Sequence, residues 1–144
     1  MERNNLYILC IHKDWPKARK YLSSDAAEEE KKSNIMYRER HGRTCLNRAF
    51  YYEAPDDIIK AMIDIGGKEL VIKKDNVTGT ALHSACLHGK SYDIIKMLIE
   101  VGGNDLVTAK DDCGNNAFVL AIVVYEWTRQ ARRENQTHFS SQRT

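Results

Sequence analysis

One stretch of this chain occurs twice at a fixed distance. Residues 57–75 read DIIKAMIDIGGKELVIKKD, and residues 93–111, which start 36 positions later, read DIIKMLIEVGGNDLVTAKD. Eleven of the 19 paired positions carry the same residue. Self-similarity at a period of about 20–50 residues is typical of proteins that stack one structural unit on the next. The repeat therefore predicts a stacked array, and it favours binding over catalysis.

The first half of each unit is predicted to be an inner helix. Runs 42–49, 78–85 and 114–121 align at a spacing of 36 residues. A short hydrogen-bonding side chain precedes the apolar run in each unit, as helix N-caps do. These predicted caps are Thr44, Thr80 and Asn116.

The second half of each unit is predicted to be an outer helix followed by a loop. Residues 58–63 and 94–99 carry an apolar stripe at helical spacing. Gly66-Gly67 and its counterpart 36 residues later are expected to end these helices. The remainder, as far as Asp75 in one unit, is predicted to be a polar connector with a hairpin-like turn.

These units resemble the ankyrin repeat over roughly residues 5–125. The resemblance rests on Thr80-Ala-Leu-His83, Ala85 and Gly89, which match the family's T-P-L-H-x-A-A-x-x-G run. Cys45, Ala81 and Ala117 stand where the family favours proline. The resemblance implies an all-α, ankyrin-type helical repeat solenoid with short hairpin-like loops. It also implies a non-catalytic module for protein–protein interaction, with the partner on the concave face.

We expect one domain over residues 1–135, with units at about 1–38, 39–74, 75–110 and 111–135. The segment 23–32 is predicted to be a charged, solvated helical extension. In the last unit the apolar stripe is lost, so the inner helix is expected to continue as one long helix toward Arg133. Residues 136–144 are predicted to be a disordered tail.

Composition is consistent with a soluble protein of the cytoplasm or nucleus. The chain has 144 residues, of which 42% are hydrophobic and 29% charged. It has no apolar run of about 18 residues, so we expect no membrane insertion. The four cysteines stand singly, which favours reduced thiols over a disulfide framework.

Catalytic, cofactor and metal sites are not predicted. His83, Cys86 and His88 could be read as metal ligands, but the two histidines point in different directions on a helix. In the ankyrin repeat the histidine at the position of His83 serves the unit's own hydrogen bonds. Net charge is only +2, and no aromatic stacking platform accompanies the basic C-terminal stretch, which disfavours nucleic-acid binding.

A partner-binding surface is predicted where the repeat pattern leaves residues free. The column Ile11, Tyr51, Leu87 and Val123 is apolar and recurs with the repeat, which favours a contact surface. The alternative is that neighbouring long side chains cover this column. The predicted partner-binding residues are Ile11, His12, Arg40, His41, Arg43, Tyr51, Tyr52, Asn76, Val77, Leu87, His88, Asp112, Val123 and Val124.

Two further expectations concern the C-terminal end. Because the last outer helix has lost its apolar stripe, we expect weak self-association through this end or weak amide-exchange protection beyond about residue 117.

The alternative to an independent binding module is a fragment or terminal part of a larger ankyrin-repeat scaffold with no separate activity.

Overall fold

The computed structural model describes residues 5–76 and 79–141, but not the side chains of residues 5, 119–120, 123–124, 127 and 137–141. All regular secondary structure in this part of the chain is helical. The helices are α1 (Asn5–Ile11), α2 (Trp15–Leu22), α3 (Glu28–Met36), α4 (Cys45–Tyr51), α5 (Asp56–Val71), α6 (Ala81–Leu87), α7 (Tyr92–Val107) and α8 (Ala117–Ser141).

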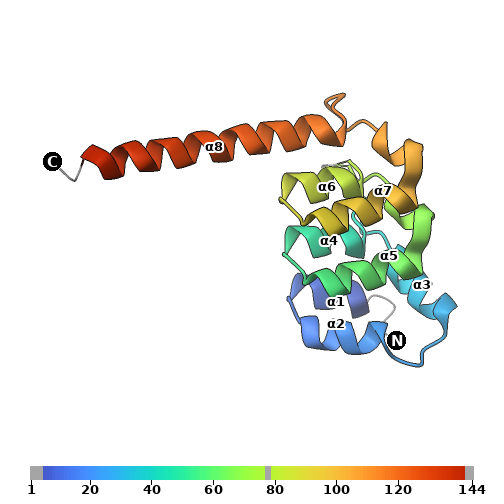
Figure 1. The fold of residues 1–144 in the computed structure, drawn as a ribbon. Helices are drawn as coiled ribbons and strands as arrows, with labels where there is room; N and C mark the ends of the chain where they lie inside the picture. The colour runs from blue at the N-terminus through green and yellow to red at the C-terminus, as the bar shows by residue number, and fades with distance from the viewer. Residues whose placement is uncertain (1–4, 77–78, 142–144) are drawn as a thin grey trace.

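The helices form hairpin pairs, and the pairs are stacked (Figure 1). α1 pairs with α2, α4 with α5, and α6 with α7. The inner helices α1, α4 and α6 form one layer, while the outer helices α2, α5 and α7 form the other. α8 packs on α6 as the inner helix of a fourth unit. The predicted all-α fold of repeated helix pairs is confirmed.

The core lies between the two layers and repeats with the sequence. Leu46 and Leu82, which are 36 residues apart, are both fully buried. The small residues Ala49 and Ala85 follow one helical turn later and are also fully buried. Small side chains here let one inner helix approach the next closely. Ile58 and Ile94 occupy the matching positions on the outer helices, with 1% and 0% exposure.

A residue with left-handed backbone geometry follows each of the inner helices α1, α4 and α6. Lys13, Glu53 and Gly89 have φ angles of 55°, 58° and 62°. In each case the following amide donates a hydrogen bond to a carbonyl five residues earlier, for example from Ala54 to Ala49 at 2.8 Å. This is the Schellman arrangement, which ends a helix and turns the chain back. It positions the start of the outer helix.

The predicted hairpin-like loops are built around a carboxylate that recurs every 36 residues. The amide of Asp75 donates to the Gly79 carbonyl at 2.9 Å, and the Gly79 amide donates to Asp75 Oδ1 at 3.1 Å. Asp111 and Asn115 form the same pair of bonds, both 2.8 Å long. Neighbouring loops are joined, because the Asn76 amide donates to the His41 carbonyl at 3.1 Å.

The segment after each glycine pair differs from the prediction. Gly67 and Gly103 have φ angles of 62° and 64° and break the helix, as expected. A further helical turn follows, however, and its Leu70, Val71 and Leu106 are buried. The connector is therefore not wholly polar, since these apolar side chains pack under the turn. A side chain on Gly66 would collide with the side chain of Leu70.

α3 takes the place of this turn in the first unit, and it is only partly solvated. Its first-turn glutamates are exposed, as predicted. Lys31 and Ile35, however, are buried, with 4% and 0% exposure. The Lys31 ammonium donates to the Ser24 carbonyl at 2.6 Å, which accounts for a buried cation. The prediction of a solvated extension over residues 23–32 was therefore wrong for Lys31, and the buried Ile35 lies just beyond that segment.

α8 forms the single long helix expected at the C-terminal end. It leaves the stack and reaches Ser141 (Figure 1). Helix therefore continues past residue 136, where we had expected the tail to begin, and residues 142–144 lie outside the described part. Side chains along residues 128–136 are exposed. No outer helix follows α8 among the described residues.

Candidate functional site

The site is built on the last turns of the inner helices α1, α4 and α6 and on the loops that precede α4 and α6. We call this surface the inner-helix face. The structure shows where the predicted partner-binding residues lie on this face. Tyr51 on α4 is 60% exposed and Leu87 on α6 is 41% exposed, whereas Ile11 packs partly against the core.

Three rings from two units meet at the centre of this face. The rings of Tyr51 and Tyr52 are edge to face, with centroids 4.9 Å apart. Tyr51 also meets His88 of the next unit edge to face, with centroids 6.0 Å apart. Aromatic rings prefer this geometry because the positive edge of one faces the negative face of the other. The cluster connects α4 to the C-terminal end of α6.

Arg48 extends the cluster into the first unit. Its Nε donates to the Tyr7 hydroxyl at 2.9 Å, and its guanidinium carbon lies 5.7 Å from the Tyr7 ring and 5.9 Å from the Tyr52 ring. The Lys13 ammonium lies 5.9 Å from the Tyr52 ring. Aromatic and cationic side chains therefore form a continuous row across three units.

Charge on Arg48 is maintained in this partly buried position. Burial alone would lower the pKa of Arg48, but the hydrogen bond with Tyr7 and the neighbouring Tyr52 and Glu39 outweigh it and raise that pKa. The side chain therefore remains a cation on the inner-helix face.

His88 is shifted toward its neutral form. Burial lowers the pKa of His88 from 6.5, the nearby Lys90 charge lowers it further, and Glu53 acts against both. The lowered pKa favours the neutral ring at pH 7, and this ring lies edge to face with Tyr51.

A shallow hollow of about 90 Å³ lies beside the ring cluster. It is lined by Arg43, Asn47, Arg48, Tyr51, Asp75, Ser84 and His88. Three of these residues, Arg43, Tyr51 and His88, were predicted as partner-binding from the sequence. Asp75 is 5% exposed and is bonded within its loop, so the guanidinium groups contribute most of the accessible charge.

The remaining predicted residues lie at the margins. His12, Arg40, His41, Asn76 and Asp112 are exposed. Val77 and the side chains of Val123 and Val124 lie outside the described residues. His41 and Asn76 are brought together by the bond that links neighbouring loops.

Sequence reasoning missed Tyr7, Lys13 and Arg48. Arg48 on α4 and Tyr52, the residue that caps the end of α4, are four residues apart, and that spacing could have indicated a shared face. The contact between Tyr7 and Arg48 has no such signal, because it depends on how the first unit docks on the second.

His83 serves the repeat's own hydrogen bonding, as the resemblance implied. The Thr80 amide donates to His83 Nδ1 at 3.2 Å, so that nitrogen must be an acceptor. Nε2 then carries the proton and donates to the Asn115 carbonyl at 2.9 Å. Both ring nitrogens are thus engaged within the protein. In the described part of the chain, no group of three His, Cys, Asp or Glu residues is placed to hold a metal.

The buried thiols are poor nucleophiles. Burial raises the pKa of Cys10 to about 12, and burial also raises the pKa values of Cys45 and Cys86. A thiol reacts as the thiolate, so these groups are inert at neutral pH.

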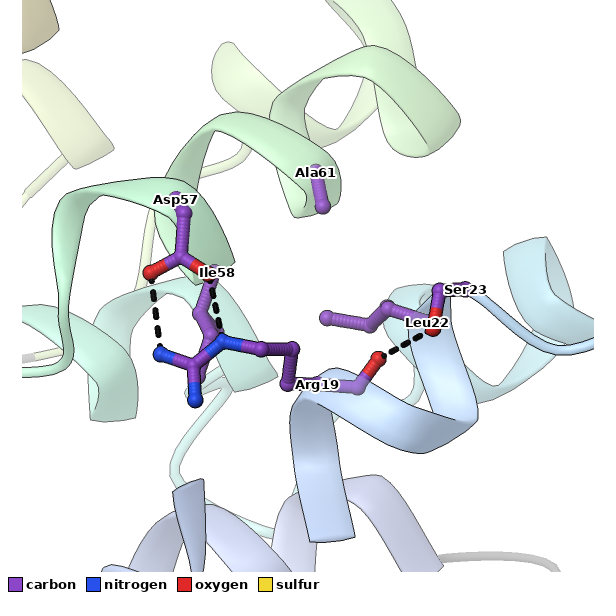
Figure 2. Close-up of a pocket in the computed structure, with 6 residues that line it drawn as sticks. All are labelled: Arg19, Leu22, Ser23, Asp57, Ile58 and Ala61. Atoms are coloured by element: carbon purple, nitrogen blue, oxygen red, sulfur yellow. Dashed lines mark hydrogen bonds and ion pairs between the residues drawn. The ribbon is translucent and has the colours of Figure 1, made fainter. Parts of the chain in front are cut away.

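A second hollow, of about 190 Å³, lies between the outer helices α2 and α5. Figure 2 shows the residues that line it. Arg19 Nε and Nη2 donate to the carboxylate of Asp57 at 2.6 and 3.1 Å, and this bond lowers the pKa of Asp57. Leu22, Ile58 and Ala61 supply apolar walls. Its cation and carboxylate neutralise each other, so this hollow has little charge to offer a ligand.

Comparison with known families identifies one unit. Residues 78–108, which contain α6 and α7, match the family model of the ankyrin repeat. The chain carries an ankyrin repeat. The same helix pair, Schellman turn and carboxylate loop occur around α4 and α5, one repeat earlier. No curated protein and no solved structure matches the chain.

An ankyrin repeat indicates a module for protein–protein interaction. No helix in the described residues is both long enough and apolar enough to cross a membrane.

Proposed function

We propose that this protein is a non-catalytic interaction module that binds a partner protein through its inner-helix face. The observation that carries the proposal is the row of aromatic and cationic side chains across three units. Tyr51 is 60% exposed although its position makes no demand for an apolar side chain. Exposed tyrosine provides contact area at low entropic cost and is enriched at binding hot spots. In an ankyrin repeat protein, such a row is best explained as a docking surface.

The charges of the face favour an acidic partner segment. Lys13, Arg43 and Arg48 border the ring cluster, and Arg40 lies at the neighbouring loop. The guanidinium groups of the three arginines can pair with carboxylates in two parallel hydrogen bonds, and the Lys13 ammonium adds a further positive charge. The preferred partner is therefore a protein segment with Asp or Glu near an apolar or aromatic anchor.

A display library of random peptides tests this proposal. Binding peptides should be rich in Asp and Glu, and the double variant Tyr51→Ala, Tyr52→Ala should bind them at least tenfold more weakly, since hot-spot truncation costs about 2 kcal/mol or more. Tyr92→Ala is the matched control, because Tyr92 is 77% exposed on the outer helix α7. Equal losses in both variants would contradict the inner-helix face as the binding site.

A second candidate is a part within a larger ankyrin-repeat scaffold, with no separate activity. The open C-terminal end of the stack favours it, as does the weak self-association that we propose for this end. Further 36-residue units in a longer reading frame would support the scaffold. For either function we propose the cytoplasm or nucleus, which imaging of the tagged chain would test.

A further inference from the structure

Core positions are left open where the stack ends at α8. Phe118 and Ile122 lie 36 residues after Leu82 and Cys86. Leu82 and Cys86 are 0% and 5% exposed, but Phe118 and Ile122 are 41% and 63% exposed. One unit earlier still, Leu46 and Phe50 are both fully buried. These two repeat positions are thus buried in the second and third units but exposed in the fourth.

The neighbouring outer helix shows the same difference. Ile59 and Ile63 on α5 are fully buried, whereas Ile95 and Ile99 on α7 are only partly buried. α7 itself packs along α5, but no outer helix lies beyond α7 in the described residues. Ile95, Ile99, Phe118 and Ile122 together form what we call the C-terminal patch. By the register of the repeat, one more outer helix would pack against these four side chains.

The end of α8 is not suited to cover this patch by folding back. The register of the repeat places Gln130, Ala131, Glu134 and Asn135 where an outer helix has its apolar stripe. Three of these four side chains are polar and could not replace the isoleucines and leucine of α7. A covering helix must therefore come from elsewhere.

We propose that the C-terminal patch is covered by the α8 helix of a second copy, in an antiparallel pair centred near Ile122. This inference rests on the self-association proposed above and specifies the surface through which the two copies associate. Phe118, Ile122 and Tyr125 follow one helix face at spacings of four and three, and Tyr125 is 64% exposed. A two-fold axis near Ile122 places Phe118 of each copy opposite the helical turn of α8 that begins after Tyr125 in the other copy.

The direction of this pairing matches the repeat. Within a unit the inner and outer helices form a hairpin and run antiparallel, as α6 and α7 do (Figure 1). A two-fold axis perpendicular to α8 also makes the two α8 helices antiparallel. The second copy thus supplies a helix in the direction that the absent outer helix would have.

Charge at the two ends of the pair is complementary. Asp112 and Arg132 each lie ten residues from Ile122, on opposite sides of it, and both are exposed. With the axis at Ile122, Arg132 and Arg133 of one copy approach the loop that holds Asp111 and Asp112 in the other. A parallel arrangement would instead bring the arginines of the two copies together.

The area involved predicts a weak dimer. Fully burying an aromatic side chain removes about 150–250 Å² from water, and the patch residues are already partly covered. A few such side chains per copy give less than the roughly 1,200 Å² that stable interfaces bury. We therefore expect a dimer that dissociates on dilution.

Sedimentation velocity over micromolar to millimolar chain concentrations tests the proposal. The intact chain should show a reversible dimer, and Ile122→Glu should raise its dissociation constant at least tenfold. Ala131→Glu, on the opposite and exposed face of α8, is the matched control and should leave dimerisation unchanged. Circular dichroism of each variant checks that helix content is retained. A chain that stays monomeric throughout, or an Ile122→Glu variant that still dimerises, would overturn the proposal.

Cross-linking tests the register separately. In a Cys113→Ser background, Ile122→Cys should form an intermolecular disulfide under mild oxidation, whereas Ala131→Cys should not. Preferential cross-linking at Ala131→Cys would overturn the antiparallel pairing about Ile122. Peptide binding to the inner-helix face of Ile122→Glu should equal that of the intact chain, so failure of the dimer and failure of the proposed binding function remain distinguishable.

Discussion

The ring of Tyr51 meets the ring of His88 edge to face, with centroids 6.0 Å apart and an interplanar angle of 87°. These residues belong to successive units, so the contact joins the inner-helix face of one repeat to that of the next. It also makes the face sensitive to the protonation of His88.

The first prediction concerns pH. The folded-state pKa of His88 is lowered from 6.5, chiefly by burial. Between that lowered value and 6.5 the unfolded chain binds more protons, so stability should fall as the pH drops through 6.5 and level off below the folded-state pKa. Melting temperatures measured from about pH 8 to 5 should decline more for the intact chain than for His88→Gln, which lacks this titration.

Proton NMR of the His88 ring gives an independent check. Its titration midpoint should lie below 6.5, rise in Lys90→Ala and fall in Glu53→Gln, because these charges lower and raise the pKa respectively. Opposite movements in the two variants would contradict the assigned cause.

The second prediction concerns the turn between α4 and α5. Glu53 has a φ angle of 58°, a conformation that glycine adopts without strain. Left-handed geometry costs a non-glycine residue about 1–2 kcal/mol, and the greater freedom of glycine in the unfolded chain offsets part of that. Urea denaturation should therefore show Glu53→Gly to be more stable by roughly 0.5–1 kcal/mol.

Gly89 provides the reverse control at the equivalent position of the next unit. A Cβ there would have no atom within 4 Å, so Gly89→Ala introduces strain without a steric clash. It should destabilise the protein by about 1 kcal/mol. If Glu53→Gly is destabilising while Gly89→Ala is not, the two turns do not share one geometry.

The third prediction concerns His83, which is fully buried and links the second and third loops. His83→Ala leaves the Thr80 amide and the Asn115 carbonyl without this partner, and a buried group left unpaired costs about 1–3 kcal/mol. We expect a loss of roughly 2–4 kcal/mol in the free energy of unfolding. His83→Asn should recover part of it, because Asn47 in the preceding unit bonds the Thr44 amide in the same way, at 3.1 Å.

The repeat could be predicted because its period recurs in the residues themselves. Thr44 and Thr80 begin their helices as N-caps, and Leu46 and Leu82 are buried as their matching positions required. Such features depend on local spacing, which a sequence displays directly.

Features that depend on packing between units could not be read in this way. The bond of Arg48 with Tyr7 joins residues 41 positions apart, whose proximity follows from docking of the first unit on the second. The helical turn after Gly67 was missed because a glycine pair was taken as the end of helical structure, although Leu70 beyond it supplies an apolar anchor.

The last prediction concerns the open end of the stack. Replacing the chain after Glu126 with a short turn and a designed outer helix should cover Ile95, Ile99, Phe118 and Ile122. The designed helix would carry the apolar stripe of α7 on its inner side and polar residues outside, as capping units of solenoids do. Each Å² of apolar surface that the designed helix buries should add about 25 cal/mol to the free energy of unfolding. The melting temperature should therefore rise, and the chain should become monomeric because the patch is covered.

A control helix of the same length carries Ser and Gln in place of the apolar stripe. It distinguishes the effect of apolar burial from the effect of replacing the chain after Glu126. It should give neither the higher melting temperature nor the gain in amide-exchange protection expected beyond residue 117. Equal stabilisation by both helices would mean that the apolar stripe is not what the patch lacks. Strong protection through Arg133 in the unaltered monomer would instead show that α8 alone caps the array. Since α8 leaves the stack and Ile122 remains 63% exposed, we expect the designed stripe to be required.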